Sequence, residues 1–279
     1  MKRLLMLVAA AMAAVFAIAA QASAQQASGA VPGGMARVEG GTFDMGGRSV
    51  TVCAFYMDAR LVTQREWLEL MGTTLQQQRD AAQRDQGWMP GFAGEGDNHP
   101  MYNVSWFEAA EFANRRSQRS GLTPAYAISG TGANRVVTWN RAANGYRLPT
   151  EAEWEFAARG GTACGGNFRY SGSDVASEVA WHMGNSGGGA QPVGTLRPNA
   201  LGIYDMSGNL WEWVWDRHGR LPTGGQATNP EGAPLGSFRV ARGGSWVNSP
   251  EHVRSANRTL FGPSRRYLSV GFRLVRPAD

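Results

Sequence analysis

Short clusters of apolar and β-branched residues between glycines open the patterned part of the chain. They occupy residues 35–38, 42–45 and 50–57. Short apolar runs that are bounded by glycine are typical of β-strands joined by tight turns. The sequence therefore predicts small antiparallel sheets at the start of the fold.

Three helix starts share one signature, in which Ser or Thr is followed three residues later by Glu. The pairs are Thr63 with Glu66, Ser105 with Glu108, and Thr150 with Glu153. In such a capping box the hydroxyl accepts a hydrogen bond from a free helix N–H, and the glutamate returns one. Large apolar residues follow in each first turn, so each helix should have a core-facing side. Gly72, Gly121 and Gly160 are the expected left-handed stops.

From residue 161 onward the chain shows no long helical period. Glycines, prolines and isolated aromatic residues separate short β-type runs such as 238–241 and 271–275. Long irregular stretches inside a compact domain are uncommon unless they are functional or are held by ions and buried polar groups. The whole pattern predicts one loop-rich α+β domain over residues 35–279, with few short helices.

The first residues have the order of a secretory signal peptide. Two basic residues precede an apolar run over residues 4–20, and the sequence Ala-Ser-Ala ends at residue 24. Cleavage there predicts a periplasmic or secreted protein. Residues 25–34 are then a flexible lead-in, and no membrane span remains after signal cleavage. The alternative is a retained membrane anchor, although the apolar run is at the short limit for a spanning helix.

The charge of the chain does not indicate a nucleic-acid partner. The formal net charge is +5, and loss of Lys2 and Arg3 with the signal peptide lowers it to +3. The mature part contains no run of like charge. A weak, dispersed excess gives no continuous basic surface for phosphates, so we expect no nucleic acid as partner.

The chain has two cysteines, Cys53 and Cys164. Export would place them where a disulfide persists. That bond would close a loop of more than a hundred residues, worth about 4–5 kcal/mol in the chain-entropy model. The alternative is that both thiols stay free and buried, and the sequence leaves the two interpretations open.

Several segments resemble those of one known family and follow its order along nearly the whole mature chain. They are Gly40-Gly-Thr-Phe-Asp-Met-Gly46, Asn103-Val-Ser-Trp106, Val137-Thr-Trp-Asn140, Tyr146-Arg-Leu-Pro-Thr-Glu-Ala-Glu-Trp-Glu-Phe156, Tyr204-Asp-Met-Ser-Gly-Asn-Leu-Trp-Glu-Trp213, Arg242-Gly-Gly-Ser-Trp246 and Gly271-Phe-Arg-Leu274. Through these segments the chain resembles the formylglycine-generating enzymes, or sulfatase-modifying factors. The resemblance implies a C-type-lectin-like α+β fold that often binds calcium.

Two carboxylates flank a glycine-containing turn in one of these segments. Such a turn aims backbone carbonyls inward and supplies the oxygen-only surroundings that calcium prefers. By resemblance, the calcium ligands are the side chains of Asp205 and Glu212 and the carbonyl oxygens of Gly208 and Leu210. The alternative is that Asp205 caps the turn and Glu212 pairs with an arginine. The family's other calcium site lacks its asparagine here, where Trp181 or His182 stands.

The ligands for the family's oxidase chemistry are missing. Oxygen-dependent members hold copper with two cysteines after a Gly-Gly-Ser-aromatic motif, because Cu(I) needs soft thiolates. Here Asn248 occupies the first cysteine position and the second falls in a deletion. Iron-dependent relatives use several histidines. This chain has only His99, His182, His218 and His252, with no two at helix-face spacing. We therefore expect neither copper nor iron and assign no catalytic residue.

Between residues 239 and 276, segments that match the family alternate with positions that follow no pattern. These eleven positions are Val247, Ser249, Glu251, His252, Thr259, Leu260, Phe261, Ser264, Arg266, Tyr267 and Ser269. The alternation resembles the ligand-facing segment of lectin-fold variable proteins and also of ordinary bacterial members of the family. Mixed aromatic, arginine and small polar side chains suit recognition.

These observations favour an exported member of the family that acts as a ligand-binding or protein-binding module. Its ligand, a protein or a glycan, is unknown. Two alternatives stay open. One is a periplasmic protein-modifying oxidoreductase that uses a metal site not visible in the sequence. The other is a calcium-dependent, sugar-binding lectin.

Overall fold

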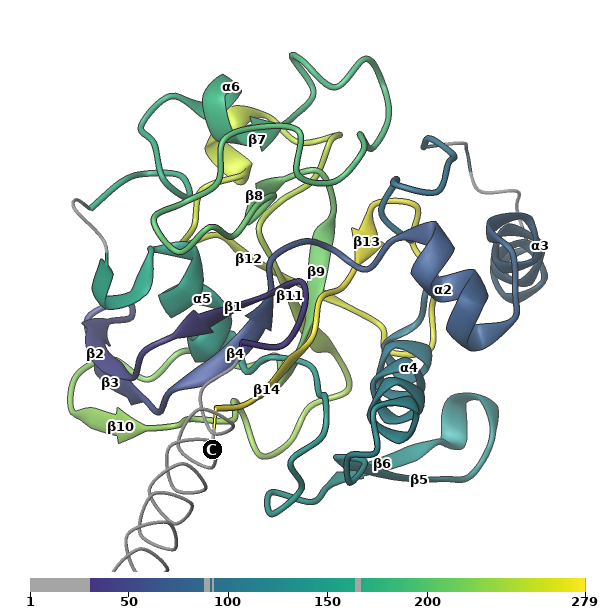
Figure 1. The fold of residues 1–279 in the computed structure, drawn as a ribbon, viewed down its shortest axis with the longest axis horizontal. Helices are drawn as coiled ribbons and strands as arrows, with labels where there is room; N and C mark the ends of the chain where they lie inside the picture. The colour runs from purple at the N-terminus through teal and green to yellow at the C-terminus, as the bar shows by residue number, and fades with distance from the viewer. Residues whose placement is uncertain (1–30, 88–90, 92, 164–166, 279) are drawn as a thin grey trace, which may run out of the picture. The chain divides into compact units, whose positions relative to one another are not determined.

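The structure, a computed structural model, describes residues 31–87, 91, 93–163 and 167–278. Residues Gly34–Asp279 cluster into one compact unit, drawn as a ribbon in Figure 1. The predicted signal peptide and most of the predicted lead-in lie outside the described residues. Within the described ranges, no helix has both the length and the apolar character that a bilayer-spanning segment needs.

The three predicted capping boxes all begin helices. α2 (Gln64–Met71), α4 (Trp106–Arg119) and α5 (Glu151–Ala158) each show both hydrogen bonds of the box. α3 (Leu75–Gln86) begins at a fourth box, Thr74 with Gln77, which was not predicted. The remaining short helices are α6 (Ala176–Val179), η1 (Gly132–Asn134), η2 (Gly161–Ala163) and η3 (Pro250–His252).

The predicted glycine stops lie at or just beyond the helix ends. Gly72 is the C-cap of α2, with φ of 73°. α4 and α5 are capped by Ser120 and Arg159, and the predicted glycines follow one residue later with φ of 68° and 89°. Left-handed φ values are accessible to glycine without a Cβ clash, so the chain turns away from each helix axis at these points.

Within the described ranges, the strands form five small sheets. One has the order β1-β4-β14, from Met35–Val38, Phe55–Asp58 and Val275–Pro277, and another has the order β10-β3-β2, from Gln226–Thr228, Ser49–Val52 and Gly41–Asp44. The four-stranded sheet has the order β12-β11-β9-β13, from Arg258–Phe261, Arg239–Arg242, Trp211–Arg217 and Val270–Gly271. The two-stranded sheets pair β5 (Tyr126–Ser129) with β6 (Val136–Trp139), and β7 (Ala180–Trp181) with β8 (Ser207–Gly208).

The four-stranded sheet separates two hydrophobic cores. Successive strand residues point to opposite faces, so Trp213 and Ala241 enter one core, whereas Val214 and Val240 enter the other. The first core contains the apolar sides of α2 and α4. The second contains α5, all of whose residues are buried. Figure 1 shows α5 on one side of β9 and β11, and α2 and α4 on the other.

Two predicted strands are wrong in their boundaries. The run 50–57 is divided between β3 and β4, with Cys53 and Ala54 between them. The run 271–275 is divided between β13 and β14 in the same way. In both cases an apolar stretch continues while the chain passes from one sheet to another, so burial alone did not mark the break. The predicted α+β class, with few short helices and small sheets, is confirmed.

Candidate ligand-binding surface

Buried arginines hold the segment that carries the unpatterned positions. Arg242 is fully buried, and its guanidinium donates to the Glu155 carboxylate. It also donates to the backbone carbonyl oxygens of residues 255–257, at 2.9–3.1 Å. Arg258 donates two hydrogen bonds to Glu151, at 2.7 and 2.8 Å. Because a guanidinium carries five donors in a fixed plane, each arginine fixes several groups at once.

All eleven unpatterned positions reach the surface. Five are exposed: Val247, Glu251, His252, Leu260 and Ser264. Six are partly exposed: Ser249, Thr259, Phe261, Arg266, Tyr267 and Ser269. The residues that match the family between them are largely buried, including Arg242, Ser245, Ser255, Phe272 and Arg273. The segment therefore turns its framework inward and its unpatterned side chains outward.

The first part of this surface, residues 247–252, is a closed turn followed by η3. The side-chain oxygen of Asn248 accepts from the backbone N–H and the hydroxyl of Ser245, at 2.9 and 2.8 Å. Its backbone carbonyl accepts the N–H of Met183, just beyond β7, at 2.9 Å. The Ser249 hydroxyl lies 3.0 Å from Nδ1 of His252. Asn248, which the family resemblance places at the position of the first copper cysteine, thus closes a turn here.

The second part of the surface, residues 259–269, is divided by strand β12. Leu260 lies opposite Val240, and Thr259 lies opposite Ala241. Because side chains alternate across a strand, Leu260 lies on the face of the four-stranded sheet that α5 covers, whereas Thr259 and Phe261 lie on the opposite face. The structure therefore does not bring Leu260 together with its sequence neighbours.

Phe261 and Tyr267 form an aromatic pair beside the first core. Their ring centroids are 4.4 Å apart, and the Phe261 ring lies 5.9 Å from that of Trp213. Arg266 is anchored to two helices, since it donates to Glu108 of α4 at 2.7 Å and forms an ion pair with Asp85 of α3. This part of the surface is therefore held in place before any ligand arrives.

The predicted calcium ligands lie along the segment around β8 and the start of β9. Gly208 is in β8 and Leu210 directly precedes β9. Glu212 is fully buried and accepts from Arg273 at 2.7 and 2.8 Å and from the Trp154 indole N–H at 3.0 Å. Asp205 accepts the backbone N–H of Gly194 at 2.8 Å. The arginine pairing that the sequence left as an alternative is present.

These two carboxylates are both buried, and Arg273 pairs with Glu212. Burial raises the pKa of Asp205, although the Gly194 N–H and the Arg273 charge oppose that rise, and the Glu212 charge adds to it. Asp205 has no ion pair within the described residues, and a bound cation would stabilise its charged form. The residues present fit a calcium ion, whose ligands would be the predicted set. The calcium site stays a prediction.

The histidines do not gather into one site within the described residues. Burial lowers the pKa of His99, His182 and His218. Among the described residues, no three His, Cys, Asp or Glu side chains are grouped so as to hold a metal ion. Cys53 is exposed, so the alternative prediction of a buried thiol is wrong for this residue. Its sulfur accepts a hydrogen bond from the Asn229 amide at 3.1 Å. Cys164 lies outside the described residues, and the disulfide stays a prediction.

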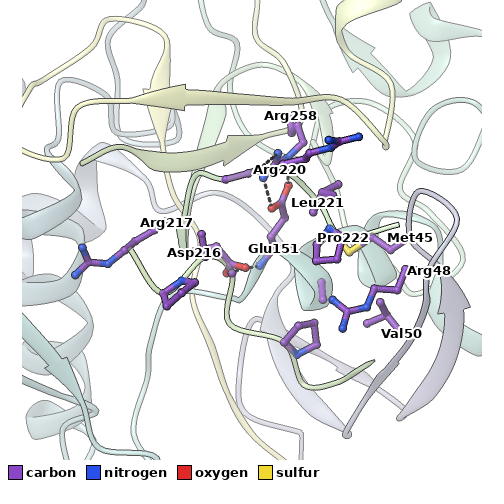
Figure 2. A pocket seen from close by; sticks show the side chains of 16 residues that line it. Met45, Arg48, Val50, Glu151, Asp216, Arg217, Arg220, Leu221, Pro222 and Arg258 are labelled. Carbon is purple, nitrogen blue, oxygen red and sulfur yellow. Dashed lines mark hydrogen bonds and ion pairs between the residues drawn. The ribbon is translucent and has the colours of Figure 1, made fainter. Parts of the chain in front are cut away.

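A cavity of about 220 Å³ opens beside the N-terminus of α5 (Figure 2). Its apolar lining includes Met45, Val50, Leu221, Pro222, Pro230 and Pro234. Its charged lining consists of Arg48, Arg217, Arg220, Arg258, Glu151 and Asp216. No sequence pattern indicated this site, because its walls come from five separate segments of the chain.

Asp216 has an unusual position at the floor of this cavity. Its carboxylate accepts the first backbone N–H of α5, that of Glu151, at 2.8 Å. Burial raises the pKa of Asp216 well above its ordinary range, and the nearby Glu151 charge raises it further. Gly232 packs on this side chain so closely that a Cβ there would lie 2.6 Å from the Asp216 Cβ. The cavity wall is thus built against a carboxyl group that favours its neutral form.

The small sheets, the fully buried helix α5 and the long irregular connections define a C-type-lectin-like α+β scaffold. Residues 20–278 match the model of the sulfatase-modifying factor enzyme 1-like domain, and the chain belongs to this family. The family resemblance in the motifs is therefore confirmed, together with the fold that it implied.

Three comparisons illustrate this membership. The chain is 34% identical over 272 residues to the "Chaperone protein LppX" of Paenibacillus barcinonensis, covering 86% of this chain and 88% of that protein. It is 28% identical over 293 residues to the formylglycine-generating enzyme of Bos taurus, covering 88% and 77%. The solved structure of Treponema denticola variable protein 1 matches with a TM-score of 0.74 and 28% identity, covering 87% and 94%.

Proposed function

We propose that this chain is an exported binding module of the sulfatase-modifying factor family, and that it recognises a protein through the unpatterned positions other than Leu260, here called the recognition surface. One observation carries the proposal. Every residue of the recognition surface reaches solvent, while the segments between them that match the family are largely buried and are held by arginines such as Arg242. A rigid scaffold with outward, unpatterned side chains suits recognition, because little conformational entropy is lost on binding.

The chemistry of the recognition surface favours a protein ligand over a glycan. It combines the Phe261 and Tyr267 rings with an anchored Arg266 and exposed apolar groups such as Val247. Aromatic and arginine side chains are enriched at the energetic centres of protein interfaces. Two relatives carry names that agree with such a role, one as a chaperone and the other as a variable protein.

We further propose that the chain does not oxidise cysteine to formylglycine. Asn248 stands at the position of the first copper ligand, and its amide oxygen is used to close the turn on Ser245. An amide supplies no soft thiolate for Cu(I). The alternative is a metal-dependent oxidoreductase, which requires stoichiometric copper or iron in the purified protein.

Calcium belongs to the proposal as a structural cofactor. The side chains of Asp205 and Glu212 and the carbonyl oxygens of Gly208 and Leu210 would hold it. Support comes from the oxygen-only donor set and from Asp205, a buried carboxylate whose charge no ion pair within the described residues offsets. Bound there, the ion would fix the start of β9, which forms the centre of the sheet beneath the recognition surface.

A matched pair of variants tests the binding role. The surface variant combines Val247→Glu with His252→Ala, and the control variant combines Val136→Glu with Val175→Glu, at two exposed valines outside the recognition surface. Each protein is immobilised and exposed to envelope extract of the producing cells, and retained proteins are quantified by mass spectrometry. Charge in an apolar contact typically weakens binding at least about tenfold.

We expect the wild type and the control variant to retain the same protein or proteins, and the surface variant to lose at least about nine-tenths of them. Identical retention by all three immobilised proteins would contradict the role of the recognition surface. Retention that glycosidase treatment abolishes would replace the protein ligand by a glycan. Stoichiometric copper or iron in the purified chain, with oxygen uptake on a cysteine peptide, would establish the oxidoreductase instead.

A further inference from the structure

The cavity beside α5 is lined by three arginines, Arg48, Arg217 and Arg220, that form no ion pair within the part of the chain that the structure describes. Arg217 donates to the Gly236 carbonyl oxygen at 3.0 Å. Arg48 donates one N–H to the Gln226 carbonyl oxygen at 3.3 Å, and its Nε is buried without a partner in the described structure. Figure 2 shows Arg48 on the same side of the pocket as Val50 and Pro222.

The two acidic residues of the lining do not cancel this charge. Glu151 is already matched by Arg258 through two hydrogen bonds, and Arg242 lies 3.6 Å from it. Asp216 accepts the N–H of Glu151, and its burial favours the neutral carboxyl. The charge that remains available to a ligand is therefore positive, which favours an anion.

The size and wall of the cavity restrict the rest of the ligand. A cavity of roughly 150 Å³ is sufficient for benzene, so about 220 Å³ suits one ring with a short substituent. The wall includes three prolines, Pro222, Pro230 and Pro234, together with Met45, Val50 and Leu221. Proline has a fixed φ and no N–H, so this wall is stiff and offers few donors of its own.

We propose that this pocket binds a small organic anion, a carboxylate carried on a single apolar ring, with the carboxylate at Arg48 and the ring against the proline wall. The site is separate from the recognition surface and does not depend on the proposed protein ligand. It joins an apolar enclosure to a few charged groups, which is the usual composition of a small-molecule site.

The test uses phenylacetate as the probe, measured by calorimetry and by NMR shifts on the mature chain. Phenylacetamide has the same shape without the charge, phenethylamine reverses the charge, and acetate lacks the ring. Arg48→Met removes one arginine, and Arg119→Met, an exposed arginine in the last turn of α4, is the matched control. Leu221→Trp fills the pocket without changing its charge, and covers the case in which Arg48→Met does not fold.

We expect saturable binding of phenylacetate with a Kd below about 1 mM, and shifts confined to the cavity lining. Phenylacetamide, phenethylamine and acetate should each bind at least about tenfold more weakly, as should phenylacetate to Arg48→Met or Leu221→Trp. Arg119→Met should bind like the wild type. The proposal is overturned if phenylacetate does not saturate at about 10 mM, if the amide binds as tightly as the acid, or if neither pocket variant weakens binding.

Discussion

Replacing Arg242 with methionine removes the buried guanidinium that holds the backbone of residues 255–257, next to the recognition surface. Arg242→Met deletes the donors to Glu155 and to three backbone carbonyl oxygens, in a place with no access to water. Breaking a buried ion pair from one side typically costs about 3–5 kcal/mol. Each orphaned buried acceptor adds about 1–3 kcal/mol. Glu155 keeps its second partner, Arg159, at 2.7 Å, which limits the loss.

The expected loss in the free energy of unfolding is therefore at least about 4 kcal/mol. For a chain of this length, 1 kcal/mol corresponds to about 2–4 °C, so Tm should fall by at least about 8 °C. Urea unfolding and calorimetry measure both quantities, and hydrogen exchange should report faster opening at residues 255–257. Arg115→Met is the control, because this exposed arginine forms a surface pair with Glu111, worth about 0.3–0.5 kcal/mol, and one long hydrogen bond of 3.4 Å to the Leu70 carbonyl oxygen. A loss below about 1 kcal/mol for Arg242→Met would refute the account of the framework.

Three further predictions concern pH, calcium and export. Asp216→Asn keeps an acceptor for the α5 N–H but cannot titrate. Because the pKa of Asp216 is raised in the native state, the native protein holds a proton that the unfolded chain releases as pH rises. In urea titrations the wild type should therefore lose stability relative to this variant as pH rises from about 4 to 8. A flat or rising difference would contradict that shift. EDTA should lower Tm and release about one calcium per chain if Asp205 and Glu212 hold the ion, whereas an unchanged Tm on a calcium-free chain would contradict the site. Intact-mass analysis of the envelope fraction should find a mature N-terminus at Gln25, and an uncleaved chain in the membrane fraction would contradict export.

Local signals in the sequence predicted the helices well, because a capping box is formed by residues three apart. Thr63, Ser105 and Thr150 begin helices for this reason. α3 was missed although Thr74 and Gln77 form the same kind of box. Its segment is almost entirely polar. The buried positions do recur every third or fourth residue, but they are not all apolar, so the apolar period that supports a helix prediction is absent.

Features that depend on contacts between distant segments escaped prediction. β12 was taken for unpatterned surface, since its side chains are partly exposed and its partner β11 is separated from it by a long connection. The alternation along β12 then places Leu260 away from Phe261, which no sequence motif indicates. The cavity beside α5 is a stronger case, because Arg48, Asp216 and Leu221 meet only in the folded chain. The choice of Arg273 as the partner of Glu212 likewise appears only in three dimensions.

Site-specific photocrosslinking in the producing cell tests the binding role most directly. A benzophenone amino acid is placed at Val247, on the recognition surface, and at Val136, in the hairpin of β5 and β6. The two valine side chains are 46% and 59% exposed, so the control probe at Val136 is at least as accessible as the probe at Val247. Our account predicts a dominant protein adduct from position 247 that is absent from position 136 and disappears when His252→Ala and Tyr267→Ala are added. The same adducts from both positions, or none from position 247, would contradict the claim that this chain is a binding module.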